Sequence, residues 1–348
     1  MCRGFGTIWC ACRSGTAAAT HGSWEDFYMA KNTQRIGWIG MGRMGYAMAE
    51  RLVSAGLDVS IWNRTRAKAD PLAAKGGKVV DKLSDLASVD VLFSIVSTGK
   101  DVKEVYFGPN GVFPNGKGKG PAVFVDCSTI AVEDSSDIRE KLKGLGSDFV
   151  AAPISGNAKV IKAGKLSAVT SGPEAAYKKV AELIEIIAPA GVAYVGEGEL
   201  ARVCKIAHNV MLGVVIENLI EITLLANKMG VPREAFLKFM NNSVMGSMFT
   251  RYKAPALVNL DWTTTFTPEL LRKDIDLGLE LGREYDVPMP VTAATREVIQ
   301  NHFGAAMLQK DPKAYIEKDF AAMMETMALA AGMKLESENK NVPTGLEH

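Results

Sequence analysis

The chain has few cysteines and histidines for its 348 residues, and it has no charge excess and no long apolar run. Its five cysteines are scattered, and the closest pair, Cys10 and Cys12, lacks a second ligand pair. We therefore predict no metal site and no disulfide framework. A net charge of +1 argues against nucleic acid or an anionic membrane as a partner. We find no uninterrupted run of about 18 apolar residues, so no transmembrane helix is predicted.

The chain does have length and apolar content. Hydrophobic residues make up 47% of it, which supports large buried cores and two domains. Residues 1–33 have no acidic residue before Glu25, but only Arg3 and Arg13 are basic ahead of it. This favours an upstream extension, disordered or a leader, over an organellar transit peptide. We expect a cytoplasmic protein and leave import through residues 1–33 open. Residues 336–348 are predicted to form a tail that ends in a possible cloning remnant.

The most informative segment spans residues 34–65. Gly40, Gly42 and Gly45 form G-x-G-x-x-G between an apolar run at 36–39 and a helix-like stretch, and a second apolar run follows at 59–62. This strand–turn–helix–strand context is typical of dinucleotide binding, whereas the glycines alone would fit a structural turn. The free N–H groups at the helix N-terminus would hold the pyrophosphate. The predicted loop residues are Gly40, Met41, Gly42, Arg43, Met44 and Gly45.

The end of the second strand indicates which dinucleotide is bound. An NAD-preferring site usually has Asp or Glu there to accept from the ribose 2′-hydroxyl. This chain instead has Asn63, followed by Arg64, Thr65 and Arg66. These groups would bind a 2′-phosphate that a carboxylate would repel, so we expect NADP(H) to be preferred over NAD(H). The alternative is that the two arginines are solvated charges at the start of a helix.

Apolar strand-like runs alternate with helical stretches from 34 to 197, which predicts a parallel, helix-covered sheet. From 198 onward the strand signals vanish and only helices are predicted. The first is a long helix at 199–229, ended by Gly230 with Pro232 just beyond. The expected strands are 35–40, 58–63, 78–80, 89–96, 122–127, 148–154, 166–171 and 192–196. The expected helices include 44–56, 66–76, 100–106, 132–144, 173–189, 233–241, 250–258, 268–285, 290–305 and 311–332.

Lys205 and Asn209 are four residues apart on the long helix and project from one face. The neighbours of Lys205 are apolar, so this lysine is either snorkelling or functional. Oxidation of an alcohol at a nicotinamide leaves a hydroxyl proton to be taken up. Burial and the cationic nicotinamide would lower the pKa of the lysine, which would suit it for general base and, in reverse, general acid. Asn209 would hold the substrate oxygen or orient the amine, whereas a lone His208 is more often structural.

Two loops at the carboxyl ends of strands would face this helix, where ligands of such sheets bind. In the first, the hydroxyls of Ser128 and Thr129 would meet a substrate carboxylate or the nicotinamide, unless they cap the helix at 132. The second is Pro-Ile-Ser-Gly-Asn at 153–157. Its backbone N–H groups and Asn157 form a candidate carboxylate cradle, unless the segment is a simple turn.

Taken in order, these motifs resemble the β-hydroxyacid dehydrogenase family, which includes 3-hydroxyisobutyrate dehydrogenase and glyoxylate/succinic semialdehyde reductases. The matching segments are Gly-Trp-Ile-Gly-Met-Gly-Arg-Met-Gly, Asn-Arg-Thr, Asp-Cys-Ser-Thr, Pro-Ile-Ser-Gly-Asn, Lys-Ile-Ala-His-Asn and Phe-Thr-Pro-Glu-Leu-Leu-Arg-Lys-Asp. The resemblance implies an α/β fold with an N-terminal Rossmann-type domain at 34–197 and a long interdomain helix. A C-terminal all-α domain would span 198–335 and form a homodimer or homotetramer.

The resemblance also implies residue roles. Lys205 would be catalytic, Thr129 would face the cofactor, and Lys273 would reach the cofactor from the helical domain. The Asn-Arg-Thr segment resembles that of the NADPH-preferring semialdehyde reductases, which adds Asn63, Arg64 and Thr65 to the cofactor site. The substrate contacts would be Ser128, Ser155, Gly156, Asn157 and Asn209.

Two departures from the family pattern concern the substrate pocket. Asn157 replaces the second glycine of the usual Ser-Gly-Gly, and lysines follow it at 159, 162 and 165, one of which could meet an extra anionic group. His208 replaces the usual Asn. The resulting Lys-x-x-His-Asn resembles 6-phosphogluconate dehydrogenase, but Leu212 occupies the position of that enzyme's glutamate, which disfavours decarboxylating chemistry.

The sequence therefore predicts an NADP-dependent oxidoreductase. It would transfer a hydride between nicotinamide and a short 3-hydroxy acid or its semialdehyde, with Lys205 as general acid and base. Two alternatives remain: an imine reductase of the same architecture, or a non-catalytic NADP-binding oligomerisation module. Members of both kinds lack the lysine that this chain has at position 205.

Overall fold

The computed structural model describes residues 33–347, and the residues from Gln34 onward belong to one structural unit. The extension predicted at 1–33 lies outside the described residues, apart from Thr33. Strands occur only up to Tyr194 in the described chain, and the segments after them are helices joined by turns and irregular connections. The predicted α/β fold with a helical C-terminal part is therefore confirmed.

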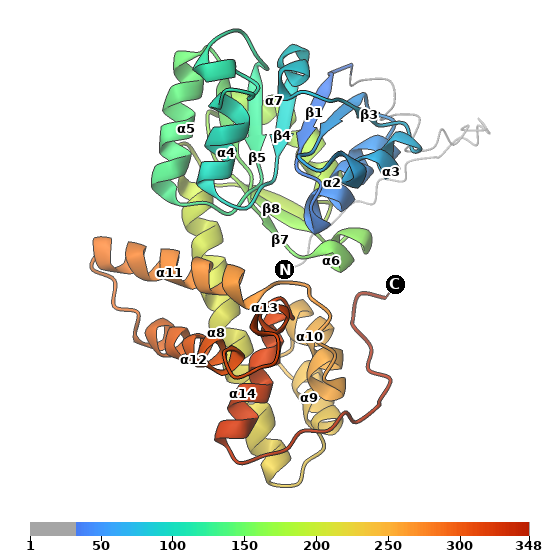
Figure 1. Ribbon diagram of the computed structural model, residues 1–348, viewed down its shortest axis with the longest axis vertical. Helices are drawn as coiled ribbons and strands as arrows, with labels where there is room; N and C mark the ends of the chain where they lie inside the picture. The colour runs from blue at the N-terminus through green and yellow to red at the C-terminus, as the bar shows by residue number, and fades with distance from the viewer. Residues whose placement is uncertain (1–32, 348) are drawn as a thin grey trace, which may run out of the picture. The chain divides into compact units, whose positions relative to one another are not determined.

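A six-stranded parallel sheet forms the core of the first part, in the order β3-β2-β1-β4-β5-β6 (Figure 1). The central strands are fully buried, as expected for a parallel sheet covered on both faces. The strand order reverses direction between β1 and β4, and ligands of such sheets bind at this switch point, beyond the carboxyl ends of the strands. The strands are β1 (Ile36–Ile39), β2 (Val59–Trp62), β3 (Lys78–Val79), β4 (Val91–Ser94), β5 (Val123–Asp126) and β6 (Asp148–Ala151).

The covering helices are mostly those predicted. One exception is the helix expected at 66–76, which is instead a 3-10 turn followed by a single α-turn. Pro71 explains the break, because proline is tolerated in the first turn of a helix but not in its interior. The elements are α2 (Arg43–Ser54), η1 (Arg66–Lys68), α3 (Asp70–Ala73), η2 (Leu83–Ser88), α4 (Gly99–Phe107), η3 (Pro114–Gly116), α5 (Val132–Gly144) and α7 (Glu174–Ile187).

A second, three-stranded sheet corrects the prediction of a single parallel sheet. Here β7 (Ile154–Ser155) pairs antiparallel with β8 (Ser167–Thr170), and β8 pairs parallel with β9 (Gly191–Tyr194). The strand predicted at 148–154 ends at Ala151, because Pro153 lacks the N–H that would continue the ladder. The chain turns there, and the short α6 (Ala158–Lys162) connects β7 to β8.

The helical part is built around α8 (Leu200–Lys228), against which α11 and α12 pack (Figure 1). This helix is long and apolar enough to cross a membrane by length and composition alone, but half of its most apolar window is buried inside the protein. The helix predicted at 311–332 is broken, because the buried Asp319 carboxylate caps a new turn by accepting from Ala321 N–H. The remaining elements are α9 (Arg233–Asn242), α10 (Met248–Asn259), α11 (Pro268–Glu284), α12 (Pro290–Ala306), α13 (Pro312–Ile316), η4 (Phe320–Ala322) and α14 (Met323–Ala330).

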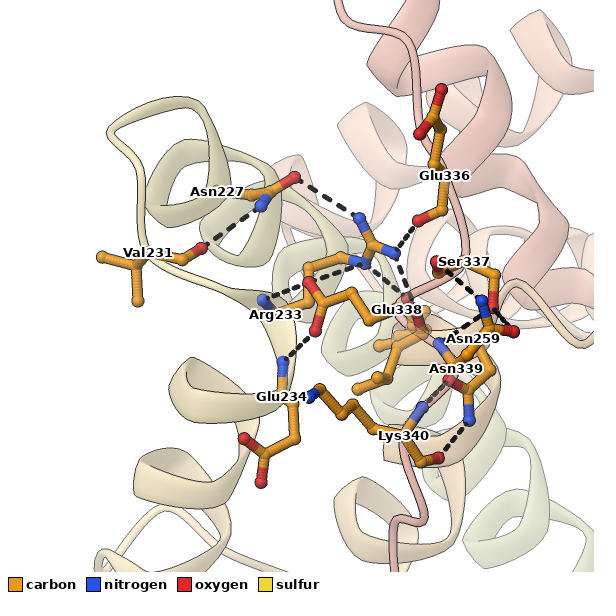
Figure 2. Close-up of polar contacts among 12 residues, drawn as sticks. Asn227, Val231, Arg233, Glu234, Asn259, Glu336, Ser337, Glu338, Asn339 and Lys340 are labelled. Atoms are coloured by element: carbon orange, nitrogen blue, oxygen red, sulfur yellow. Dashed lines mark hydrogen bonds and ion pairs between the residues drawn. The ribbon is translucent and has the colours of Figure 1, made fainter.

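The C-terminal tail is docked on these helices rather than separate from the fold (Figure 2). The Glu338 carboxylate accepts the N–H groups of Arg233 at 2.7 Å and Glu234 at 3.0 Å. It thereby caps α9, whose own N-cap residue Pro232 offers no side-chain acceptor. The Arg233 guanidinium donates to the Glu336 carbonyl at 2.5 Å and to the Val258 carbonyl at 2.8 Å. The tail predicted at 336–348 is thus part of the packed structure, as far as the buried Leu346.

Candidate active site

A large cleft of about 1410 Å³ lies beyond the carboxyl ends of the strands and is lined by both the sheet and the helical elements. Its walls come from the loops after β1, β2, β4, β5 and β7, and from α8, α10 and α11. All of the predicted site residues line it. They are Gly40, Met41, Gly42, Arg43, Met44, Gly45, Asn63, Arg64, Thr65, Ser128, Thr129, Ser155, Gly156, Asn157, Lys205, Asn209 and Lys273.

The glycine loop has the shape that a bound pyrophosphate requires. Gly40 has φ +100°, and a Cβ on it would lie 2.1 Å from the Ile95 carbonyl oxygen. A Cβ on Gly45 would lie 2.0 Å from the Gly40 oxygen, so α2 packs closely on β1 there. At Gly42 a Cβ would meet nothing within 4 Å, which leaves open space in front of the uncapped N-terminus of α2. These residues fit a dinucleotide, whose phosphates would lie on the free N–H groups.

Asn63 organises the turn after β2. Its side-chain oxygen accepts the Met41 N–H at 2.8 Å, and its amide donates to the Thr65 carbonyl at 2.8 Å. Arg64 and Thr65 are exposed at the rim of the cleft, where Lys68 and Lys82 also lie. Arg66 was expected to offer its charge to a 2′-phosphate, but it is not among the lining residues and instead pairs with acidic neighbours. These are Asp70, at 3.4 Å, and Asp81.

Lys205 lies near the start of α8 with only 8% of its surface exposed. Burial lowers its pKa from the usual 10.5 to about 8, an effect that Asp274 partly opposes and that Lys273 reinforces. An amine with this pKa exchanges protons readily near neutral pH. Lys205 therefore has the environment of a general acid and base, facing the same cleft as the glycine loop.

A hydrogen-bonded chain runs beside Lys205 from α11 to β7. The Asn209 amide donates to Asp274 Oδ2 at 2.5 Å, and Asn209 Oδ1 lies 2.9 Å from His208 Nδ1. The other ring nitrogen, His208 Nε2, lies 2.8 Å from Ser155 Oγ. Lys273 joins the opposite end, with Nζ 3.1 Å from Asp274 Oδ1 and 2.7 Å from the Thr129 carbonyl to which it donates. All six residues line the cleft.

Ser128 is anchored rather than free. It is 1% exposed, and its hydroxyl donates to Asp126 Oδ1 at 2.8 Å while it accepts the Val96 N–H at 2.9 Å. Asp126 is in turn paired with Arg202 at 2.7 Å, and both side chains are fully buried. The hydroxyls of this loop do not cap the next helix, since α5 begins after Ala131 without a side-chain cap.

Comparison with known proteins agrees with this arrangement. Residues 35–196 match the model of the NAD binding domain of 6-phosphogluconate dehydrogenase, and residues 200–318 match the NAD-binding domain of NADP-dependent 3-hydroxyisobutyrate dehydrogenase. Among curated relatives, glyoxylate/succinic semialdehyde reductase 2, chloroplastic, of Arabidopsis thaliana is 30% identical over 86% of this chain and 80% of its own. The 2-(hydroxymethyl)glutarate dehydrogenase of Eubacterium barkeri is 27% identical over 81% of this chain and 94% of its own.

Solved structures show the same fold. The 3-hydroxyisobutyrate dehydrogenase of Salmonella typhimurium aligns with a TM-score of 0.74 at 23% identity, over 84% of this chain and 99% of that one. An imine reductase from Pseudomonas sp. aligns with a TM-score of 0.56 at 20% identity, over 85% of this chain and 100% of that one.

The chain belongs to the NAD(P)-dependent β-hydroxyacid dehydrogenase family. It is accordingly an oxidoreductase that binds a nicotinamide dinucleotide, as its motifs predicted. Within this family the loop after β7 is where the chain departs from the usual Ser-Gly-Gly. Asn157 caps α6, since its side-chain oxygen accepts the N–H groups of Lys159 at 2.9 Å and Val160 at 3.1 Å. That oxygen is thus not free to face a ligand, and a cradle in this loop would rely on backbone N–H groups.

The three lysines after Asn157 differ in position. Lys165 lines the cleft but donates to the Gly345 carbonyl of the tail at 3.1 Å, whereas positions 159 and 162 are not among the lining residues. Sequence reasoning missed Asp274, Lys68 and Arg202, although each has a signal. Asp274 directly follows Lys273, Lys68 lies four residues after Arg64, and Arg202 lies one helical turn before Lys205.

Proposed function

We propose that this protein is an NADP(H)-dependent oxidoreductase of a short 3-hydroxy acid or its semialdehyde, with Lys205 as general acid and base. The observation that carries the proposal is a buried lysine with a pKa of about 8 in the cleft that holds the glycine loop. When bound, the nicotinamide accepts or supplies the hydride. In oxidation the Lys205 amine takes the proton of the substrate hydroxyl, and in reduction the ammonium returns it to the aldehyde oxygen.

We further propose how the substrate is held. Asn209, fixed by its bond to Asp274, orients the reacting oxygen toward Lys205. The substrate carboxylate lies against Ser155 and the backbone N–H groups of Gly156 and Asn157, with the anchored Ser128 and its loop forming the opposite wall. Gly156 gives this loop its shape, because it has φ +143° and a Cβ there would lie 2.8 Å from Val160.

The preference for NADP(H) over NAD(H) is also a proposal. Its support is that position 63 has the neutral amide of Asn63 instead of a carboxylate, and that Arg64 and Thr65 lie at the rim of the cleft. Lys68 and Lys82 at the same rim would add positive charge, and charge-assisted bonds favour a 2′-phosphate. Lys273 closes the cofactor end through its bond to Thr129. The ratio of KM for NADPH to KM for NADH tests this preference.

We propose that the helical part forms a homodimer or homotetramer. Several large apolar side chains on it are more than half exposed in a single subunit, and we propose that a second subunit covers them. They include Met211, Leu225, Met229, Val291 and Leu308. Light scattering on the purified protein measures the oligomer.

A cytoplasmic location stays a prediction. Import through residues 1–33 is compatible with the chloroplastic relative, and fractionation of cells that express the tagged full chain tests it.

The deciding experiment is a nicotinamide absorbance assay with NADPH or NADH. Succinic semialdehyde, glyoxylate, tartronate semialdehyde and methylmalonate semialdehyde serve as substrates. We expect NADPH-dependent turnover that Lys205→Ala reduces by about 10²- to 10⁴-fold, the usual contribution of general acid–base catalysis. Lys162→Ala, an exposed lysine, is the matched control. Imine reduction that survives Lys205→Ala would favour the imine reductase alternative, and cofactor binding without any turnover would favour a non-catalytic module.

A further inference from the structure

The hydrogen bonds around His208 determine which ring nitrogen carries the proton. Asp274 Oδ2 is an acceptor, so the Asn209 side chain must direct its NH₂ group toward Asp274 at 2.5 Å. The Asn209 oxygen therefore faces His208 Nδ1 at 2.9 Å, and Nδ1 must be the donor. In neutral His208 the remaining nitrogen, Nε2, then carries a lone pair and accepts a hydrogen bond.

The acceptor nitrogen has a consequence for Ser155. Its Oγ lies 2.8 Å from His208 Nε2, so with neutral His208 the hydroxyl hydrogen points to the ring and only lone pairs face the cleft. A carboxylate has no hydrogen to offer these lone pairs and would be repelled. When His208 is protonated, Nε2 becomes a donor to Ser155 Oγ, and the hydroxyl hydrogen is released to donate to an anion.

We infer that His208 makes binding of an anionic substrate at Ser155 proton-coupled, so that one proton is taken up at His208 Nε2 as the carboxylate binds. The inference rests on the proposed function, in which Ser155 contacts the substrate carboxylate. Asn209 and Asp274 are positioning residues in this chain, because they fix the ring tautomer without touching the carboxylate. His208 determines specificity, because it decides whether Ser155 offers a hydrogen or a lone pair.

The charges around His208 are consistent with this role. Burial lowers the pKa of His208, and Lys205, from the same helix α8, lowers it further. From α11, Asp274 raises it, as does the hydrogen bond to Asn209, and Lys273 is paired with Asp274. From β7 the ring meets the uncharged Ser155. With a pKa below the usual 6.5, His208 is neutral in the free protein at neutral pH, and a bound carboxylate would raise its pKa.

The pH dependence of KM tests the coupling. Between the pKa of His208 in the free protein and that in the complex, proton uptake makes the KM for succinic semialdehyde rise with pH, by up to about tenfold per pH unit. We would measure it from about pH 5.5 to about pH 7.5, below the pKa of Lys205, with saturating NADPH. His208→Asn should lose this dependence because the amide does not titrate, while His302→Gln, at a buried histidine that does not line the cleft, should keep it.

Two further measurements keep the outcomes distinct. Nitrogen-15 spectra of the four histidines, with His208→Asn for assignment, report the tautomer directly, and we expect the proton on Nδ1. Calorimetric titration of the NADP⁺-loaded protein with succinate, in buffers of different ionisation enthalpy, should show uptake of about one proton per bound anion. Turnover with a KM that is flat across this range, or a neutral ring protonated on Nε2, overturns the inference and leaves the proposed function standing. If the protein shows no turnover and also binds no carboxylate, both the inference and the proposed function are overturned.

Discussion

The protonation of Lys205 predicts how the rate changes with pH. Its pKa of about 8 places the change from ammonium to amine within the working range of most enzymes. Oxidation of a hydroxy acid needs the amine, so kcat should rise about tenfold per pH unit below the pKa of Lys205 and level off above it. Reduction of the aldehyde needs the ammonium, so its kcat should be level below this pKa and fall above it.

The size of the pKa shift can be worked out from the surroundings of Lys205. The ordinary value of 10.5 falls to about 8 because only 8% of the side chain is exposed. This net shift corresponds to roughly 3 kcal/mol by which the surroundings disfavour the ammonium relative to the amine, with burial as the largest cause. Asp274 limits the fall, so Asp274→Asn should lower the pKa of Lys205 further and move both kcat profiles to lower pH.

The assay is steady-state nicotinamide absorbance in both directions with wild type, Asp274→Asn and the control Lys162→Ala. KM is measured at each pH, so that any effect of His208 on binding is separated from the effect of Lys205 on kcat. Profiles that place the change near the ordinary lysine pKa, or that do not move in Asp274→Asn, would refute the assignment of the titrating group to Lys205.

Three further predictions concern stability and cofactor choice. Burying the charged Lys205 lowers the stability of the native state by up to about 3 kcal/mol at any pH below about 8, its pKa in the folded protein. This penalty vanishes as the pH rises through 10.5, its pKa in the unfolded chain. Lys205→Met should therefore raise the denaturation midpoint at pH 7 but not at high pH, while it reduces turnover as Lys205→Ala does; equal or lower stability at pH 7 would contradict this. Glu338→Ala removes the cap of α9 and leaves the buried Arg233 without its carboxylate partner, so we expect a loss of about 1–2 kcal/mol in urea unfolding, whereas Lys334→Ala, at an exposed residue just before the tail, should be neutral. Arg64→Ala should raise the KM for NADPH by about tenfold or more and leave the KM for NADH unchanged, and an equal effect on both cofactors would argue against a 2′-phosphate contact.

Local features of the fold were predictable because their causes are local. The G-x-G-x-x-G loop fixes a turn and a helix start through the conformation of Gly40 and the close packing at Gly45, and both are readable from spacing alone. The interruption of the helix expected at 66–76 and the end of the strand expected at 148–154 also have local causes, Pro71 and Pro153. They were not predicted because the apolar pattern continues on both sides of each proline. The limits of the two domains, 34–197 and 198–335, stay predictions.

The tail was not predictable, because its contacts join positions far apart in the chain. Glu338 caps a helix that begins about a hundred residues earlier, and Asn259 exchanges two hydrogen bonds with the backbone of Lys340 at 2.7 and 2.9 Å (Figure 2). An isolated acidic residue in an irregular segment has no local pattern that distinguishes a distant cap from a solvated charge. The sequence therefore suggested a dispensable end where the structure has a bound one.

The candidate site divides in the same way, between residues that face the cleft and residues that hold them there. Lys205 stood out because a lysine in an apolar helix is unusual, but Arg202, one turn earlier, resembled any helical arginine. Arg202 forms a fully buried ion pair with Asp126, and its guanidinium also donates to the Ser128 carbonyl. These contacts fix the loop of Ser128 and the start of α8 to each other. Removal of either charge would leave the other buried and uncompensated, at a cost of about 3–5 kcal/mol. The distance from Lys205 to the nicotinamide side of the cleft therefore depends on an ion pair between residues 76 positions apart. Such a dependence arises only when α8 packs on the end of β5, which is why the catalytic candidate could be found from the sequence while the pair that positions it could not.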